Sequence, residues 1–98
     1  MEQTHARAAA GKIASVHAYD RHVVLGEDFP EVKSREEFAN LIFEVLTQPQ
    51  SVSRLIRQGR EALWNESLRT IVILDRQSED GGTTFRPTSG RAYFRFLR

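Results

Sequence analysis

Two histidines, His17 and His22, lie within the stretch HAYDRHV and are the side chains best suited to acid–base chemistry. On a continuous α-helix their side chains point about 140° apart, because each residue turns the helix by about 100°. That angle disfavours a shared metal ion, which residues at i and i+4 can chelate. If the helix ends or bends between them, the two imidazoles can flank one substrate atom. The alternative is that both are ordinary surface or packing residues.

Cleavage of RNA is a reaction that two imidazoles can catalyse without a metal. One removes the proton from the 2′-OH, the oxygen attacks the adjacent phosphorus, and the second protonates the departing 5′ oxygen. Such a site also needs donors that hold the phosphate and stabilise its developing charge. The distribution of charge along the chain indicates where those donors come from.

The two halves of the chain carry charge of opposite sign. Residues 1–50 contain five Lys or Arg and eight Asp or Glu, whereas residues 51–98 contain nine Arg and five Asp or Glu. The planar fork of arginine suits bidentate contacts with phosphate and stacking on bases. An RNA partner is one interpretation of this pattern, and an ordinary solvated surface is the other.

The composition is that of one folded domain. The 98 residues are enough for one modest core, and 40% hydrophobic with 28% charged residues argues against global disorder. The absence of cysteine excludes disulfides, thiolate metal sites and a cysteine nucleophile. Alanine-rich residues 1–11 predict a flexible or partly helical arm, and residues 12–98 predict a single domain that we expect to be monomeric. No stretch approaches the roughly 20 apolar residues of a spanning helix, so we expect a soluble chain without membrane insertion.

Helical periodicity dominates the first half. Apolar residues from Ile13 onward recur at three- and four-residue steps and predict a histidine-bearing helix that ends before Gly26. Ser34 and Glu37 form a capping box ahead of an amphipathic stripe, which predicts a second helix. A short third helix is expected around Val52–Ile56, with Gly59 at its C-terminal end.

After Gly59 the period becomes that of strands. The predicted strands are 60–64, 70–74, 83–86 and 91–97, with Gly81-Gly82 in a turn before the third. Helices followed by four antiparallel strands predict an α+β domain whose helices pack on one face of a meander. Along the two last strands, alternation opposes a core face to a polar, cationic and aromatic face. That predicted face contains Thr84, Arg86, Arg91, Tyr93 and Arg95.

Several stretches, in order, carry a resemblance to a bacterial toxin group: HAYDRHV, EDFPEVKSREEFANLI, GR-x-x-LW, TIVILDR and GGTTFRPTSGRAYF. Residues 13–98 resemble the C-terminal nuclease domains of filamentous-haemagglutinin or CdiA-type polymorphic toxins. These belong to the broad superfamily that includes barnase, EndoU and RelE-like ribonucleases. The most specific part is the histidine stretch followed by G-T-x-F-x-P and a terminal tyrosine segment.

This resemblance implies a metal-independent endoribonuclease toxin without a cofactor, acting on RNA and plausibly on transfer RNA. His17 and His22 would be its acid and base, with Arg60, a threonine and Tyr93 completing the site. The family motif places the threonine at Thr83, while strand alternation favours Thr84, and both stay open here. As part of a larger secreted or cell-surface toxin, the domain would act in the cytoplasm of a target bacterium. A cognate immunity protein would neutralise it, and we expect this partner to cover Arg86, Arg91 and Arg95.

Two noncatalytic alternatives remain. The basic face of the last strands could dock an RNA backbone or an acidic protein without cleaving anything, and such binding would weaken steeply with salt. A nuclease-derived domain that has lost activity could also persist as an interaction surface. Cleavage of RNA distinguishes both from the enzyme.

Overall fold

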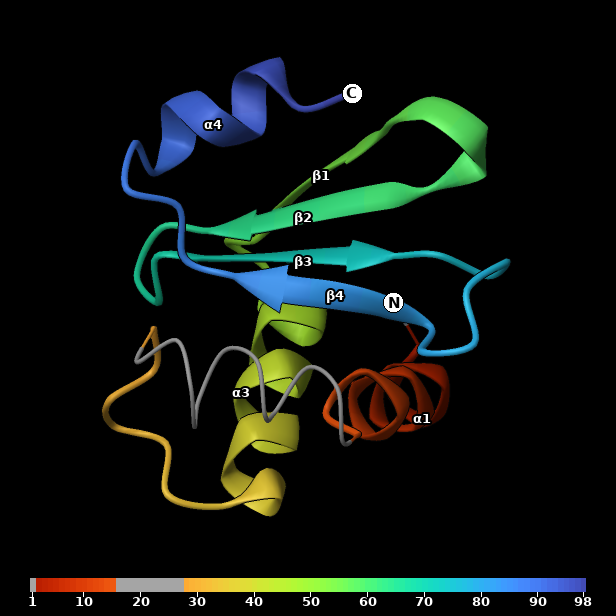
Figure 1. Ribbon diagram of the computed structural model, residues 1–98, viewed down its shortest axis with the longest axis vertical. Helices are drawn as coiled ribbons and strands as arrows, with labels where there is room; N and C mark the ends of the chain where they lie inside the picture. The colour runs from red at the N-terminus through yellow and green to blue at the C-terminus, as the bar shows by residue number, and fades with distance from the viewer. Residues whose placement is uncertain (1, 16–27) are drawn as a thin grey trace.

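The computed structural model describes residues 2–15 and 28–98, which form an α+β domain. Helices α1 (Gln3–Ile13) and α3 (Arg35–Thr47) cover one face of an antiparallel sheet, and α4 (Arg91–Phe96) lies on the other face (Figure 1). The predicted fold class, helices packed on a four-stranded antiparallel meander, is confirmed. The strands follow one another in the order β1 (Val52–Leu55), β2 (Glu61–Asn65), β3 (Thr70–Leu74) and β4 (Gly82–Phe85).

Helix α3 forms where the capping box predicts it. The Ser34 hydroxyl accepts a hydrogen bond from the Glu37 backbone N–H at 3.1 Å, and the Glu37 carboxylate accepts one from the Lys33 N–H at 3.0 Å. The first bond satisfies a backbone donor that the helix N-terminus leaves free, and the second holds the residue before the cap. The apolar stripe behind the cap is buried, namely Phe38, Leu41, Ile42, Val45 and Leu46.

Helix α1 covers most of residues 1–11, the predicted flexible or partly helical arm, and it packs on α3. Ala6, Ala10 and Ile13 repeat at four- and three-residue steps and are fully buried, because small side chains let α1 approach α3 closely. Arg7 strengthens the contact: its guanidinium donates to the Asn40 side-chain oxygen at 2.8 Å and lies 3.9 Å from the centre of the Phe43 ring. The histidine-bearing helix predicted between Ile13 and Gly26 falls mainly outside the described residues.

The sheet separates two groups of buried side chains. Leu63 and Val72 point toward α1 and α3 and join their apolar residues. On the opposite face Trp64 and Ile71 pack with Phe94 of α4. Alternation along β2 and β3 produces this division, and it buries β3 on both faces as its sequence predicts.

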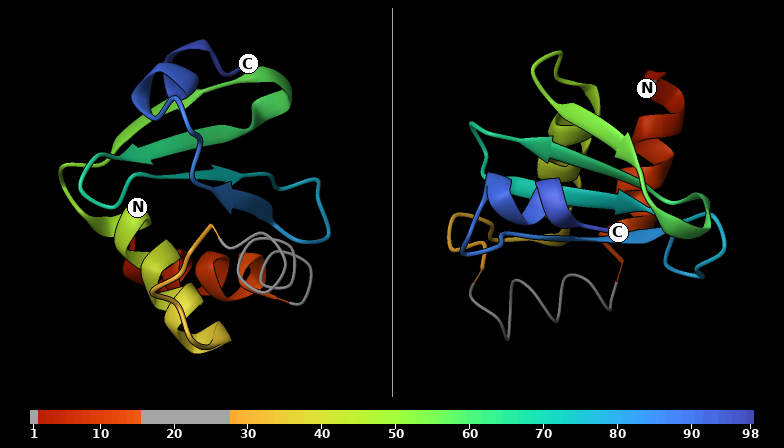
Figure 2. Two further views of the ribbon diagram at one scale, coloured as in Figure 1. Left: turned by 60° about the vertical axis from the view of Figure 1, so that its left-hand side comes forward. Right: turned by 90° about the horizontal axis from the view of Figure 1, so that it is seen from above.

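Two predicted elements are wrong. Val52–Leu55, expected to be helical, is strand β1 and pairs with β2 from Val52 opposite Trp64 to Leu55 opposite Glu61. Segment 91–97, expected to be the last strand, is instead helix α4 after Gly90, whose φ is 58°. The sheet still has four strands, because β1 adds one that was not predicted and α4 takes the place of the predicted last strand. Helix α4 packs over β2 (Figure 2).

Neither α1, α3 nor α4, the helices of the described ranges, combines the length and the apolar character that crossing a bilayer requires.

Candidate nucleic-acid interface

The two candidate histidines, His17 and His22, lie outside the residues that the structure describes. The residues on both sides of segment 16–27 are fixed near β4. Before it, the Lys12 side chain lies over Gly81, where an added Cβ would stand 3.0 Å from Lys12 Cδ. After it, the Asp28 carbonyl accepts a hydrogen bond from Arg86 at 3.3 Å. Lys12 and Asp28, on the two sides of this segment, therefore lie near the two ends of β4.

The two candidate threonines lie on opposite faces of β4. Thr84 pairs with Val72, faces the α1 and α3 layer, and is fully buried. Its hydroxyl donates to the Ile71 carbonyl at 2.8 Å, so this side chain stabilises the β3–β4 pair. Thr83 pairs with Ile73 and keeps part of its surface exposed. Of the two threonines, only Thr83 can reach a substrate without rearrangement of the core.

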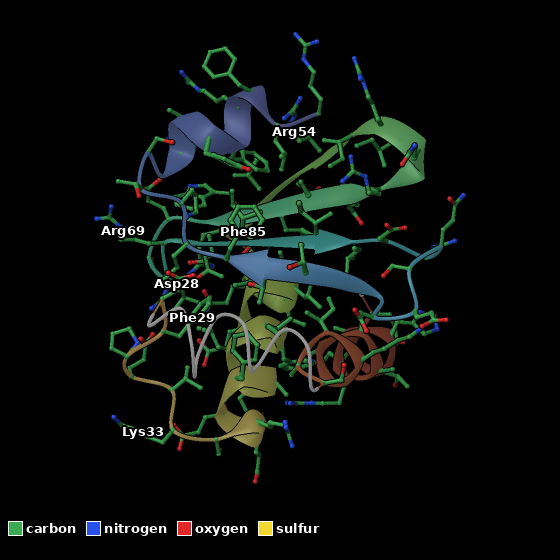
Figure 3. All side chains as sticks on the ribbon, viewed as in Figure 1. Asp28, Phe29, Lys33, Arg54, Arg69 and Phe85 are labelled. Atoms are coloured by element: carbon green, nitrogen blue, oxygen red, sulfur yellow. The ribbon has the colours of Figure 1, made fainter. Side chains whose placement is uncertain are left out.

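Arg86 is an internal anchor and not a free phosphate ligand. Its guanidinium forms a two-pronged ion pair with the Glu31 carboxylate and also donates to the Leu68 carbonyl at 3.2 Å. Thr70 Oγ1 accepts a further hydrogen bond at 3.1 Å, and the guanidinium lies 4.5 Å from the centre of the Phe29 ring. Figure 3 shows Asp28 and Phe29 beside each other near the end of β4.

The Arg86 anchor also affects the acidity of its partner. Hydrogen bonding from the Arg86 guanidinium holds the pKa of Glu31 below its ordinary value of 4.5, although partial burial of the carboxyl acts in the opposite direction. The Glu31 side chain is 54% exposed, so solvent screens the pair. Its main effect is therefore to fix the position of the segment at Asp28–Glu31.

Tyr93, Arg91 and Arg95 lie on α4, so they do not share a sheet face with Thr84 and Arg86. The Tyr93 ring packs edge-to-face on Phe85, with ring centres 5.4 Å apart, and keeps 43% of its surface exposed. Arg91 and Arg95 are exposed. The prediction of a single cationic sheet face is therefore wrong. Thr84 and Arg86 lie on the side of the sheet that α1 and α3 cover, whereas the other three residues lie on a helix.

Arg60 contacts the chain just after the C-terminal end of α4, whereas Tyr93 lies within that helix. Gly90, before α4, approaches the Trp64 ring, whereas Arg60 donates to the Arg98 carbonyl at 2.8 Å. Arg54, which the sequence did not single out, donates to the Phe94 and Leu97 carbonyls, each at 2.6 Å (Figure 3). Both arginines satisfy carbonyls at the C-terminal end of a short helix. They position α4 and the chain directly after it.

Sequence reasoning also missed the exposure of Phe96, which alternation assigned to the core. Phe96 is 81% exposed, and with Tyr93 it borders a hollow of about 550 Å³ on α4. A helical wheel would have placed Phe94 and Phe96 on nearly opposite sides of the helix, since side chains two positions apart point about 200° from each other around its axis.

No family model matches the chain, and a search of curated proteins finds no match.

Proposed function

We propose that this domain is a metal-independent endoribonuclease, the toxic part of a bacterial polymorphic toxin. The observation that carries the proposal is the pair His17 and His22, in a segment whose flanking residues lie near the two ends of β4. The resemblance of residues 13–98 to toxin nuclease domains gives the reaction class. RNA is the substrate class, and transfer RNA is the first substrate to test.

In the proposed reaction, one imidazole accepts the 2′-OH proton and the 2′ oxygen attacks phosphorus. The bond to the 5′ oxygen breaks, and the second imidazole donates a proton to that oxygen. The products are a 2′,3′-cyclic phosphate end and a 5′-OH end. Thr83 and Tyr93 are the remaining candidates for contact with the phosphate and a base, while Thr84 and Arg86 act in folding.

Cleavage of total bacterial RNA in excess EDTA tests this proposal. We expect His17→Ala or His22→Ala to slow cleavage by at least about 100-fold, because each removes one proton-transfer group. His5→Ala is the matched control, since the third histidine of the chain is exposed on α1. Sequencing of RNA ends would report the cleavage site and the cyclic phosphate. Cleavage at the wild-type rate by the double variant would exclude histidine catalysis.

A second candidate function is a noncatalytic module that binds RNA or an acidic protein. The exposed arginines and aromatic rings of α4 favour it. It predicts intact RNA in the same assay and no growth arrest on expression, whereas the enzyme predicts growth arrest that the histidine changes relieve.

We also propose the biological setting that this toxin class implies. The domain would reach the cytoplasm of a neighbouring bacterium as part of a secreted or cell-surface toxin, and an immunity protein would protect the producing cell. The arginines available to such a partner are Arg91 and Arg95, since Arg86 is engaged with Glu31 on the other face of the sheet. We therefore propose that the immunity protein contacts the two arginines of α4 and not Arg86.

A further inference from the structure

We propose that α4 carries an RNA-docking surface, which holds single-stranded RNA by base stacking and phosphate contacts. This α4 face consists of Arg91, Tyr93, Arg95, Phe96 and Arg98. The inference rests on the proposed RNA substrate but not on catalysis by the histidines. It concerns the face of the sheet opposite α1 and α3 (Figure 2).

The aromatic side chains of α4 are more exposed than packing requires. Phe94, on the inner side of the helix, is 5% exposed and fills the core under α4, whereas Phe96 is 81% exposed. Tyr93 lies one helical turn before Phe96 and is 43% exposed. Because Phe94 already provides the buried contact, the exposed phenylalanine adds little to folding and offers a flat apolar ring to a partner.

Tyr93 and Phe96 both border an open hollow of about 550 Å³. Leu97 contributes to its lining, and Arg98 does so as well. A base that enters the hollow can therefore stack on a ring while its phosphate stays within reach of a guanidinium.

The charge around the hollow selects an anionic partner. Segment 81–98 contains four arginines and no aspartate or glutamate. One of the four, Arg86, is engaged with Glu31, and the other three belong to the α4 face, where all are exposed. Arg57, on the connection between β1 and β2, is also exposed, and the neighbouring Arg60 bonds the Arg98 carbonyl. The charged side chains of the α4 face itself are therefore all positive.

The combination favours single-stranded RNA over an acidic protein. Acidic side chains would satisfy the arginines alone and make no use of two aromatic rings one turn apart. Unpaired bases offer a flat face to each ring, and stacking of a base on an aromatic side chain contributes about 1 to 3 kcal/mol. The α4 face thus holds the strand, while the segment bearing the histidines cuts it.

The test is fluorescence anisotropy of a labelled 2′-O-methyl RNA 12-mer, which has no free 2′-OH and cannot be cleaved. We expect Phe96→Ala to weaken binding by the 98-residue chain about 5- to 100-fold, since one stacked base is lost. Arg95→Gln should reduce the slope of log K against log salt by about one. Leu55→Ala is the matched control, because Leu55 is 77% exposed on β1 and outside the α4 face.

Unchanged binding by Phe96→Ala, or no binding by the wild-type chain, would overturn the docking surface. Equal binding of a poly-glutamate peptide, unaffected by Phe96→Ala, would show a general anion surface and would also overturn it. Loss of cleavage in His17→Ala with normal oligonucleotide binding supports both proposals. Conversely, histidine-dependent cleavage with no contribution of α4 to binding would remove this inference and leave the proposed function intact.

Discussion

Replacing Gly82 with alanine is expected to destabilise the domain by at least about 3 kcal/mol. Gly82 opens β4 with φ at 141°, a conformation that side chains rarely adopt, and an added Cβ would lie 1.8 Å from the Ile73 carbonyl oxygen. That atom belongs to the β3 backbone, so the clash cannot be relieved by rotation of a side chain. The β3–β4 pair would have to open at its end.

Urea denaturation followed by the fluorescence of Trp64 measures this effect, because Trp64 is the only tryptophan and is 2% exposed. The midpoint of thermal unfolding should fall by about 12 °C or more, at about 4 to 8 °C per kcal/mol for a domain of this size. Gly11→Ala is the control: it lies on α1 with open space around it, and we expect a gain of about 0.5 to 1 kcal/mol. A wild-type midpoint for Gly82→Ala would contradict the close approach of the two strands.

The second large effect is expected for Arg86→Met, which removes a part-buried guanidinium with partners on two segments. We expect a loss of about 2 to 4 kcal/mol in the free energy of unfolding, from charge-assisted hydrogen bonds and the stacking on Phe29. Arg76→Met is the control, because Arg76 is exposed on the connection between β3 and β4. Equal unfolding midpoints for the two variants would mean that the Arg86 contacts add nothing to stability.

The dependence of unfolding on acidic pH is an independent measure of how much the Arg86–Glu31 ion pair stabilises the fold. The pKa of Glu31 is lowered in the folded state, so the pair stabilises the fold above the ordinary value of 4.5. That stabilisation is lost as the pH falls through the folded-state pKa of Glu31. We expect Glu31→Gln to unfold with a shallower dependence on pH below 4.5 than the wild-type chain. Identical pH profiles of unfolding would show that the pair is screened completely.

The fold class was predictable from the sequence because its strongest signals are local. The capping box at Ser34 and Glu37 marks α3, and the apolar run Thr70–Leu74 gives the bounds of β3. The arm was underestimated because alanines carry a weak hydrophobic signal, although Ala6 and Ala10 are fully buried. Small side chains contribute by close approach, which a count of large apolar residues does not register.

The two wrongly predicted elements are short segments whose apolar residues fit both the helical and the strand period. Val52, Leu55 and Ile56 have helical spacing, yet Val52 and Leu55 are exposed, and pairing with β2 decides their conformation. In α4, only Phe94 reaches the core, so the apparent alternation was coincidental. Tertiary contacts thus override propensity in stretches of four to six residues.

The candidate site was harder to predict than the fold. Alternation correctly placed Thr84 and Arg86 together on one face, but the sequence gives no sign of which sheet face the helices cover. Contacts such as Arg86 with Glu31 and Arg54 with Phe94 join residues 55 and 40 positions apart. Partners at that separation leave no periodic pattern in the sequence.

The division of the core by the sheet has a consequence for how the sequence of such a domain can evolve. The core under α4 and the core under α1 and α3 are separate clusters, so substitutions in one should combine nearly additively with those in the other. Substitutions on the outer surface of α4 should therefore leave the stability of the core under α1 and α3 unchanged. Recognition of new partners can diversify on one side of the sheet while the scaffold on the other side stays constant.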